Sequence, residues 1–170
     1  MNETIKTLME RKSTKSFTGE HITREEIDII VEAGLKAPSG LNKQTPRFVV
    51  VTDDAVVERL SKLNAELRGM TGDPFYNAKD VIVVLVKKEG CYIYDGGVAF
   101  GNLLNASYSI GVGACWIHHA KAVFESEKGK ELLKEWGIEE DVEGIGFCVL
   151  GRELKEKPIA EIKPGRVWYI

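Results

Sequence analysis

Six consecutive apolar residues, VIVVLV at positions 81–86, constrain the fold more than any other part of the sequence. Neither face of such a strand tolerates water, so the strand must lie inside a sheet that is covered on both sides. Three further apolar runs are predicted strands, at residues 48–51, 114–117 and 145–150, and we expect the run at 48–51 to be buried as well. The run at 81–86 is then the central strand.

Helices are expected between these strands. Residues 3–11 have apolar side chains at helical spacing, and Thr23 begins a second helix in which Glu26 completes a capping box. This helix ends before Pro38, because the residue ahead of a proline avoids helical dihedrals. Further helices are predicted at about 54–68, from a cap at Asp95 to about 109, and at 127–136. Helices that alternate with apolar strands predict an α/β (α+β) fold with helices on both faces of the sheet.

The composition favours one globular domain spanning residues 1–170. The chain has 170 residues, of which 44% are apolar and 29% are charged, and its net charge of −3 gives no overall attraction to nucleic acid or an anionic membrane. No apolar run is long enough to span a bilayer, and MNETIKTLMERK lacks the apolar core of a signal peptide, so we expect a cytoplasmic protein. Cys91, Cys115 and Cys148 are odd in number and widely spaced, which favours reduced thiols in a core.

Several common chemistries lack their motifs. The glycines fit neither G-x-G-x-x-G nor G-x-x-x-x-G-K-[ST], and no G-x-S-x-G nucleophile elbow occurs. Cys115, His118 and His119 lie close together, but residues 115 and 118 of a strand face opposite sides, and no fourth ligand is suitably spaced. We therefore favour a buried thiol and two loop histidines over a metal site, and expect no bound metal.

Two irregular segments carry the remaining chemistry. The first, RKSTKSF at 11–17, has cations and hydroxyls that suit a phosphate monoester, although its cations could equally be the solvated end of the first helix. The second, APSGLNKQ at 37–44, offers Asn42 and Gln44, which both donate and accept hydrogen bonds and suit a flat heteroaromatic ring. By itself this second segment could also be an ordinary surface turn.

Taken in order, four motifs resemble those of the FMN-dependent nitroreductase family. RKSTKSF is similar to the family's R-R-S-x-R-x-F, and APSGLNKQ to its A-P-S-x-x-N-x-Q. DGGVAFGNLL at 95–104 and GVGACWI at 111–117 resemble its D-x-G-x-A-x-x-N-L-L helix and G-x-G-x-C-W strand. The resemblance implies a three-layer α/β/α sandwich that forms an intertwined homodimer with FMN at the interface. It also implies that the apolar tail at 152–170 packs on the partner subunit.

The resemblance assigns residues to this cofactor. Arg11, Ser13 and Lys15 would hold the FMN phosphate, with Lys12 assisting. Groups that line the flavin would come from the loop at 37–44, chiefly that of the partner subunit. The segment at 115–118 would pass along the ring, with backbone groups facing N5 and O4. The implied cofactor-binding residues are Arg11, Lys12, Ser13, Lys15, Pro38, Ser39, Gly40, Asn42, Gln44, Cys115, Trp116, Ile117, His118 and Arg166.

The implied activity is that of an oxidoreductase whose chemistry is carried by FMN, with no catalytic side chain of the protein. NADH or NADPH would deliver hydride, and a nitroaromatic or quinone acceptor would then be reduced in a ping-pong cycle. The alternatives are other chemistries on the same scaffold, namely dehalogenation, flavin breakdown or dehydrogenation, an FMN-binding module without reductase activity, and a structural protein that binds no flavin. The sequence departs from the family pattern at Lys15, at Thr45-Pro46 and at His118-His119-Ala120.

Overall fold

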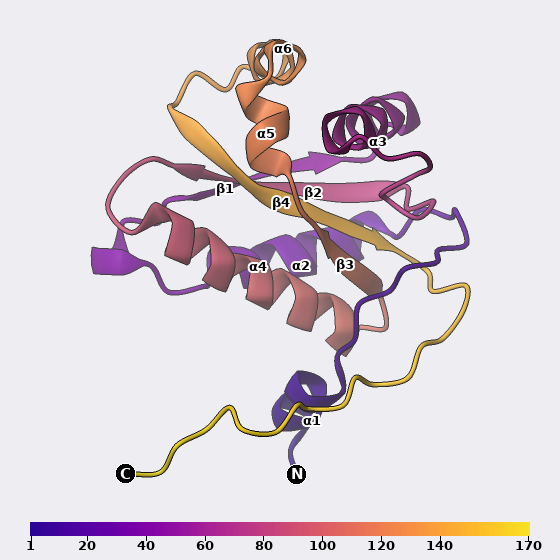
Figure 1. Cartoon of the computed structure of the whole chain (residues 1–170), viewed down its shortest axis with the longest axis vertical. Coiled ribbons are helices and arrows are strands. Elements are labelled where there is room, and N and C mark those ends of the chain that lie inside the picture. The colour runs from indigo at the N-terminus through magenta and orange to yellow at the C-terminus, as the bar shows by residue number, and fades with distance from the viewer.

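The computed structural model describes all 170 residues. Seven stretches are helical and four are strands (Figure 1). In chain order they are α1 (Glu3–Glu10), α2 (Arg24–Leu35), the 3-10 turn η1 (Gly40–Asn42), β1 (Pro46–Val51), α3 (Asp54–Arg68), β2 (Asp80–Lys87), α4 (Tyr92–Ser109), β3 (Gly113–Ile117), α5 (Ala120–Glu125), α6 (Glu127–Glu135) and β4 (Val142–Gly151).

The four strands form one sheet in the order β1-β2-β4-β3, and every neighbouring pair is antiparallel. The apolar run at 81–86 lies within β2, an inner strand, and all six residues are fully buried. Only Val51 of β1 is buried, whereas Val50 is 40% exposed. The prediction of a buried strand at 48–51 is therefore wrong, because β1 is an outer strand that helices cover less completely.

Helices cover both faces of the sheet, as predicted. In Figure 1, α3, α5 and α6 lie on one face, and α2 and α4 lie on the other. Side chains of β2 alternate between the two layers: Val81, Val83 and Leu85 join the core under α3 and α5, and Ile82 and Val84 join the core over α2 and α4. This arrangement confirms the three-layer α/β/α sandwich.

The boundaries of two helices follow from their caps. Thr23 and Glu26 form the expected capping box at the start of α2. Helix α3 has the predicted span, with Asp53 capping its first turn and Gly69 in the left-handed conformation at its end. The predicted cap at Asp95 is wrong, because α4 begins earlier, with Cys91 at the N-cap position and no side-chain cap.

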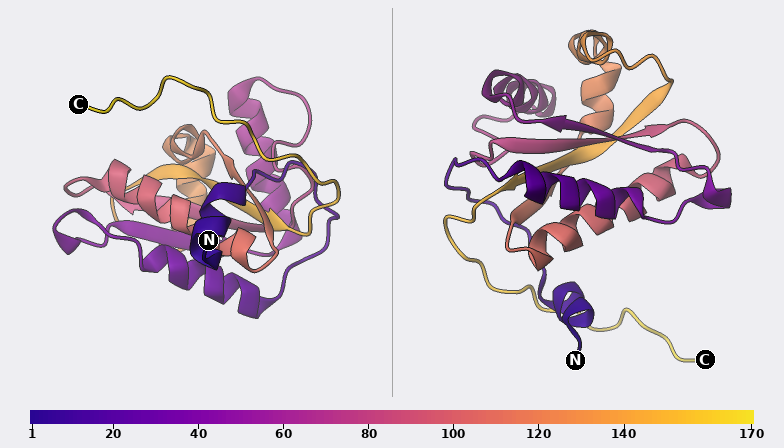
Figure 2. Two further views of the ribbon diagram at one scale, coloured as in Figure 1. Left: turned by 90° about the horizontal axis from the view of Figure 1, so that it is seen from below. Right: turned by 180° about the vertical axis from the view of Figure 1, so that it is seen from behind.

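Both terminal segments leave apolar surface uncovered. Helix α1 contains no buried residue, and its Ile5, Leu8 and Met9 are exposed. The tail leaves β4 and runs past α1 to the C-terminus (Figures 1 and 2), where Trp168 is 78% exposed. Packing of the tail on a partner subunit remains a prediction. None of the helices is long and apolar enough to cross a membrane.

The cysteines are all free thiols. Cys115 and Cys148 are buried, and burial raises the pKa of both thiols. Cys91 is exposed at the start of α4, so the prediction that all three cysteines lie in a core is wrong for this residue.

Candidate functional site

The hydroxyl-rich segment at residues 11–17 lies between β3 and the tail. The amide of Thr14 donates to the carbonyl of Ala114 in β3 at 2.9 Å, and the amide of Leu154 donates to the carbonyl of Ser16 at 2.9 Å. A side chain at Gly113 would come within 2.9 Å of the Thr14 hydroxyl, so the close approach of this segment to β3 needs glycine there. The segment is therefore held in a fixed, extended path rather than left as a solvated helix end.

Alternate residues of this segment face opposite sides. Thr14 is buried, and Lys12 forms ion pairs with Glu153 at 3.3 Å and Glu156 at 3.0 Å. The hydrogen bond from Lys12 to Glu156 raises the pKa of the lysine. Within one chain Lys12 therefore fastens the tail, and the assisting role at a phosphate remains a prediction.

Arg11, Ser13 and Lys15 lie on the other side of the segment, above Cys115. Burial raises the pKa of the Cys115 thiol, and the charge of Lys15, the hydroxyl of Ser13 and the charges of Lys157 and Arg11 partly oppose this shift. These four groups therefore all lie near the Cys115 thiol, and we call them the cationic cluster. Neither Arg11 nor Lys15 forms an ion pair within the chain, so their charge remains available for an anion.

Lys157 is a member of the cationic cluster that the sequence interpretation missed. Its charge, like those of Arg11 and Lys15, opposes the raised pKa of the Cys115 thiol, which places Lys157 near the cluster. Arg166, the tail residue that the resemblance places among the cofactor-binding residues, lies in the exposed part of the tail and forms no hydrogen bond or ion pair. Within one chain, the structure brings Lys157 rather than Arg166 to the cluster.

The loop at residues 38–45 has an unusual backbone. Leu41, Asn42 and Gln44 adopt left-handed conformations with φ of 52°, 54° and 49°, which non-glycine residues seldom do. The Gln44 amide donates to the Ser39 hydroxyl at 2.9 Å, and the Gln44 side chain donates to Asn42 Oδ1 at 3.2 Å. Pro38, Asn42 and Gln44 are exposed, whereas Ser39 and Gly40 are half-buried. The polar groups predicted to line a ring thus lie together at the surface.

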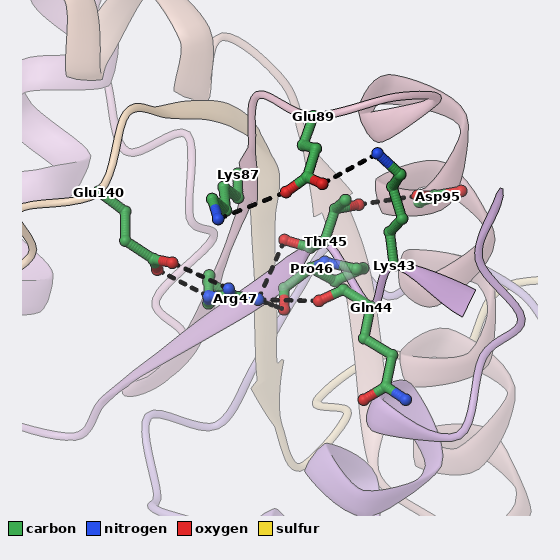
Figure 3. A network of polar contacts seen from close by, with 9 residues as sticks. All are labelled: Lys43, Gln44, Thr45, Pro46, Arg47, Lys87, Glu89, Asp95 and Glu140. Atoms are coloured by element: carbon green, nitrogen blue, oxygen red, sulfur yellow. Dashed lines mark hydrogen bonds and ion pairs between the residues drawn. The ribbon is translucent and has the colours of Figure 1, made fainter. Parts of the chain in front are cut away.

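Charged residues fasten the end of this loop (Figure 3). Arg47 forms two hydrogen bonds with Glu140, at 2.7 and 2.9 Å, and donates to the carbonyl of Gln44 at 2.8 Å. Glu89 pairs with Lys43 at 2.9 Å and with Lys87 at 3.3 Å, and hydrogen bonds from these two lysines lower its pKa.

Asp95 joins the same network from beneath the loop. Its carboxylate accepts hydrogen bonds from the amide of Gly40 and the hydroxyl of Thr45, each at 2.8 Å. The aspartate that was expected to cap a helix therefore holds the loop instead.

The predicted strand residues 115–118 divide between two faces. Cys115 and Ile117 are buried and belong to the core under α3 and α5. Trp116 points the other way, is 36% exposed, and stacks on Phe100 with ring centroids 3.9 Å apart. His118 is exposed just beyond the strand, and its carbonyl accepts a hydrogen bond from the buried side chain of Asn64 at 2.8 Å.

The two candidate segments do not meet within one chain. The cationic cluster lies beside β3, and the 38–45 loop leads into β1, and these are the two outer strands of the sheet. Figures 1 and 2 show η1 and the segment before α2 at opposite ends of the molecule. A ligand that touches both segments would need a second copy of the chain.

Comparison with known proteins agrees with the fold and the motifs. The model of the nitroreductase family matches residues 8–69. A provisional NADH dehydrogenase/NAD(P)H nitroreductase of Archaeoglobus fulgidus is 27% identical and aligns over 95% of this chain and 91% of its own length. An FMN-bound nitroreductase from Desulfitobacterium hafniense superposes with a TM-score of 0.90 at 27% identity, over 100% of this chain and 99% of that chain.

The same fold also carries a different activity. Iodotyrosine deiodinase, bound to FMN and 3-iodo-L-tyrosine, superposes with a TM-score of 0.80 at 18% identity, over 98% of each chain, which is a likeness of fold alone. The relatives with higher identity agree instead with the ordered motifs and with the family match. In both sequence and fold, the chain is therefore similar to proteins of the nitroreductase family.

Proposed function

We propose that two copies of the chain bind FMN between them and act as an NAD(P)H-dependent oxidoreductase. The cationic cluster of one copy would hold the phosphate, and the 38–45 loop of the other copy would line the ring system. The observation that carries this proposal is the fixed face formed by Arg11, Ser13 and Lys15, whose two cations have no partner within the chain.

The donors of the cationic cluster fit a phosphate monoester. Two or three cations neutralise a dianion, and charge-assisted hydrogen bonds are about twice as strong as neutral ones. Lys15 stands where the family motif has arginine, so it supplies a point charge without the planar fork of a guanidinium. The amide and hydroxyl groups of Ser39, Asn42 and Gln44 provide donors and acceptors that match the edge of a flavin.

Bound FMN would supply the site for hydride acceptance and donation, which explains why the chain needs no nucleophilic side chain. Residues of the chain would bind the phosphate, orient the ring and leave one face of it open. NADH or NADPH would serve as reductant, and a nitroaromatic or quinone would replace it as acceptor, which gives ping-pong kinetics. The supporting observation is the exposure of Asn42, Gln44 and His118.

Visible spectroscopy tests the proposal directly. We expect purified protein to be yellow or to quench FMN fluorescence on titration, and to lose its visible band anaerobically with NADH or NADPH. Arg11→Ala and Lys15→Ala should each weaken FMN binding by roughly tenfold, the loss of one charge-assisted contact. Lys12→Ala is the matched control in the same segment and should change affinity by less than about twofold, because Lys12 faces the tail. Equal effects at all three positions, or no FMN binding, would refute the phosphate site.

The runner-up functions have separate outcomes. Reduction of bound FMN by neither nicotinamide would favour a binding module without reductase activity. Slow turnover of nitroaromatics and quinones together with rapid reductive dehalogenation would favour the chemistry of the iodotyrosine deiodinase fold relative. Parallel lines in double-reciprocal plots would support the ping-pong order, whereas intersecting lines would exclude it.

A further inference from the structure

The carboxylate of Asp95 is buried without a cation. The residue lies in the first turn of α4 and is 5% exposed. Its side chain has two partners, the amide of Gly40 and the hydroxyl of Thr45, both at 2.8 Å. Burial of a carboxylate is unfavourable unless its hydrogen bonds offset the loss of water, and only the start of α4 adds a favourable dipole. Since Asp95 does not cap α4, its two hydrogen bonds to the turn are the contacts that compensate for its burial.

The two partners of Asp95 bracket a strained turn (Figure 3 shows the Thr45 contact). Between Gly40 and Thr45 lie the three left-handed residues, Leu41, Asn42 and Gln44. Such conformations persist only where surrounding contacts over-determine them. Because Asp95 ties both ends of the turn to one carboxylate, it opposes relaxation of this backbone.

The platform beneath the turn is rigid. A side chain at Gly96 would come within 2.6 Å of Ile145 and 2.7 Å of Val86, so α4 packs directly on the sheet next to Asp95. A side chain at Gly40 would come within 3.2 Å of Cys91 and 3.7 Å of the Asp95 carboxylate, so the turn also approaches α4 closely. The position of the carboxylate is therefore set by the core.

We infer that Asp95 is a positioning residue for the cofactor site, acting through the turn at residues 40–45. By holding both ends of the turn, it keeps Ser39, Asn42 and Gln44 arranged for the ring before the ring arrives, and such pre-organisation raises affinity. This inference rests on the proposed function, since it assumes that the turn contacts FMN. Asp95 itself touches neither the ring nor the substrate.

The first experiment measures the turn without any cofactor. Trypsin cleavage after Lys43, followed by mass spectrometry on the full chain freed of FMN, reports how often the turn opens. We expect Thr45→Val, which removes one of the two hydrogen bonds, to be cut about fivefold faster, and Thr45→Ser, which keeps the hydroxyl, to be cut at the wild-type rate. Equal cleavage rates for Thr45→Val and wild type would refute the inference that Asp95 holds the turn closed through Thr45.

The second experiment measures FMN affinity and the visible spectrum of the bound flavin. Thr45→Val should weaken binding about fivefold, Asp95→Ala by more than about tenfold, and both should alter the visible band, whereas Thr45→Ser should restore it. Asp73→Ala is the matched control. Asp73 holds a loop that also contains two left-handed residues, by accepting hydrogen bonds from Ser61, Phe75 and Asn77 at 2.6, 2.8 and 2.6 Å.

The outcomes separate the two proposals. Asp73→Ala should lower stability and leave FMN affinity and spectrum within about twofold of wild type. If the Asp73 variant weakens FMN as much as the Asp95 and Thr45 variants do, general destabilisation explains the data and the inference fails. Wild-type protein that binds no FMN would instead refute the proposed function, and with it the cofactor role of Asp95.

Discussion

Replacement of Gly146 by alanine should force Trp116 off its stacking partner. A Cβ at Gly146 would lie 2.4 Å from the indole Nε1 and 2.9 Å from a ring carbon of Phe100. Phe100 is fully buried and cannot retreat, whereas Trp116 is partly exposed, so the indole must move outward by about 1 Å to regain ordinary contact. The stack, with ring planes 11° apart, is then lost or weakened.

The cost follows from these contacts. Overpacking of this size destabilises by about 1–3 kcal/mol, and loss of an aromatic pair adds about 0.5–1.5 kcal/mol. Because Trp116 has room to move toward solvent, we expect Gly146→Ala to lower the free energy of unfolding by about 2 kcal/mol in total. Urea unfolding followed by far-ultraviolet circular dichroism, at one fixed protein concentration, measures this change in the free energy of unfolding.

A double-mutant cycle tests the reasoning. In a Trp116→Ala background the principal clash is absent, so Gly146→Ala should cost less than about 1 kcal/mol there. A similar cost in both backgrounds would show that the alanine acts through the strand backbone or through Phe100, and the argument from Trp116 would be wrong.

Three further predictions concern stability and reactivity. Gly129→Ala should prevent α6 from docking and cost more than about 3 kcal/mol, seen as a large fall in melting temperature, because its Cβ would strike the backbone carbonyl of Val123; a small fall would contradict this. The hydrogen bond from Arg152 lowers the pKa of Glu26 below 4.5 in the folded protein. The ionised Glu26 therefore stabilises the fold above that pH, and this contribution is lost as the pH falls through the folded-state pKa. The difference in free energy of unfolding between wild type and Glu26→Gln should narrow from pH 6 to pH 3, and a constant difference would refute the pairing. Cys91 should react rapidly with a thiol reagent while buried Cys148 does not, as counted by mass spectrometry, and rapid labelling of Cys148 would contradict its burial.

The sequence was a good guide where local signals and burial agree. Helix α3 was predicted at its observed bounds from the helical spacing of its apolar residues, and the structure adds an aspartate cap at its start and a left-handed glycine at its end. The inner position of β2 in the sheet was predicted correctly, because its run of apolar residues is long and uninterrupted. β1 was misjudged because an apolar run of four residues does not reveal whether a strand is inner or outer.

The candidate site was predictable in its segments and less so in its side chains. Periodicity could have separated Lys12 from Arg11 and Lys15, since an extended path alternates its faces, but nothing in the sequence shows that residues 11–17 are extended. The hydrogen bonds of Asp95 cross 50 and 55 positions of sequence, and no local pattern reports such contacts. Lys157 was missed for the same reason, because it is far in sequence from the segment at residues 11–17 that it approaches.

The cationic cluster and the 38–45 loop lie at opposite edges of the sheet. Each proposed FMN site therefore takes its cluster from one polypeptide and its loop from the other. In a homodimer of the Arg11→Ala variant, or of the Asp95→Ala variant, both FMN sites carry a lesion and bind FMN weakly. Hybrids formed by co-refolding them would contain one site built from two undamaged halves and one with both lesions, so about a quarter of all sites should regain normal FMN affinity. A site contained within one polypeptide would regain none.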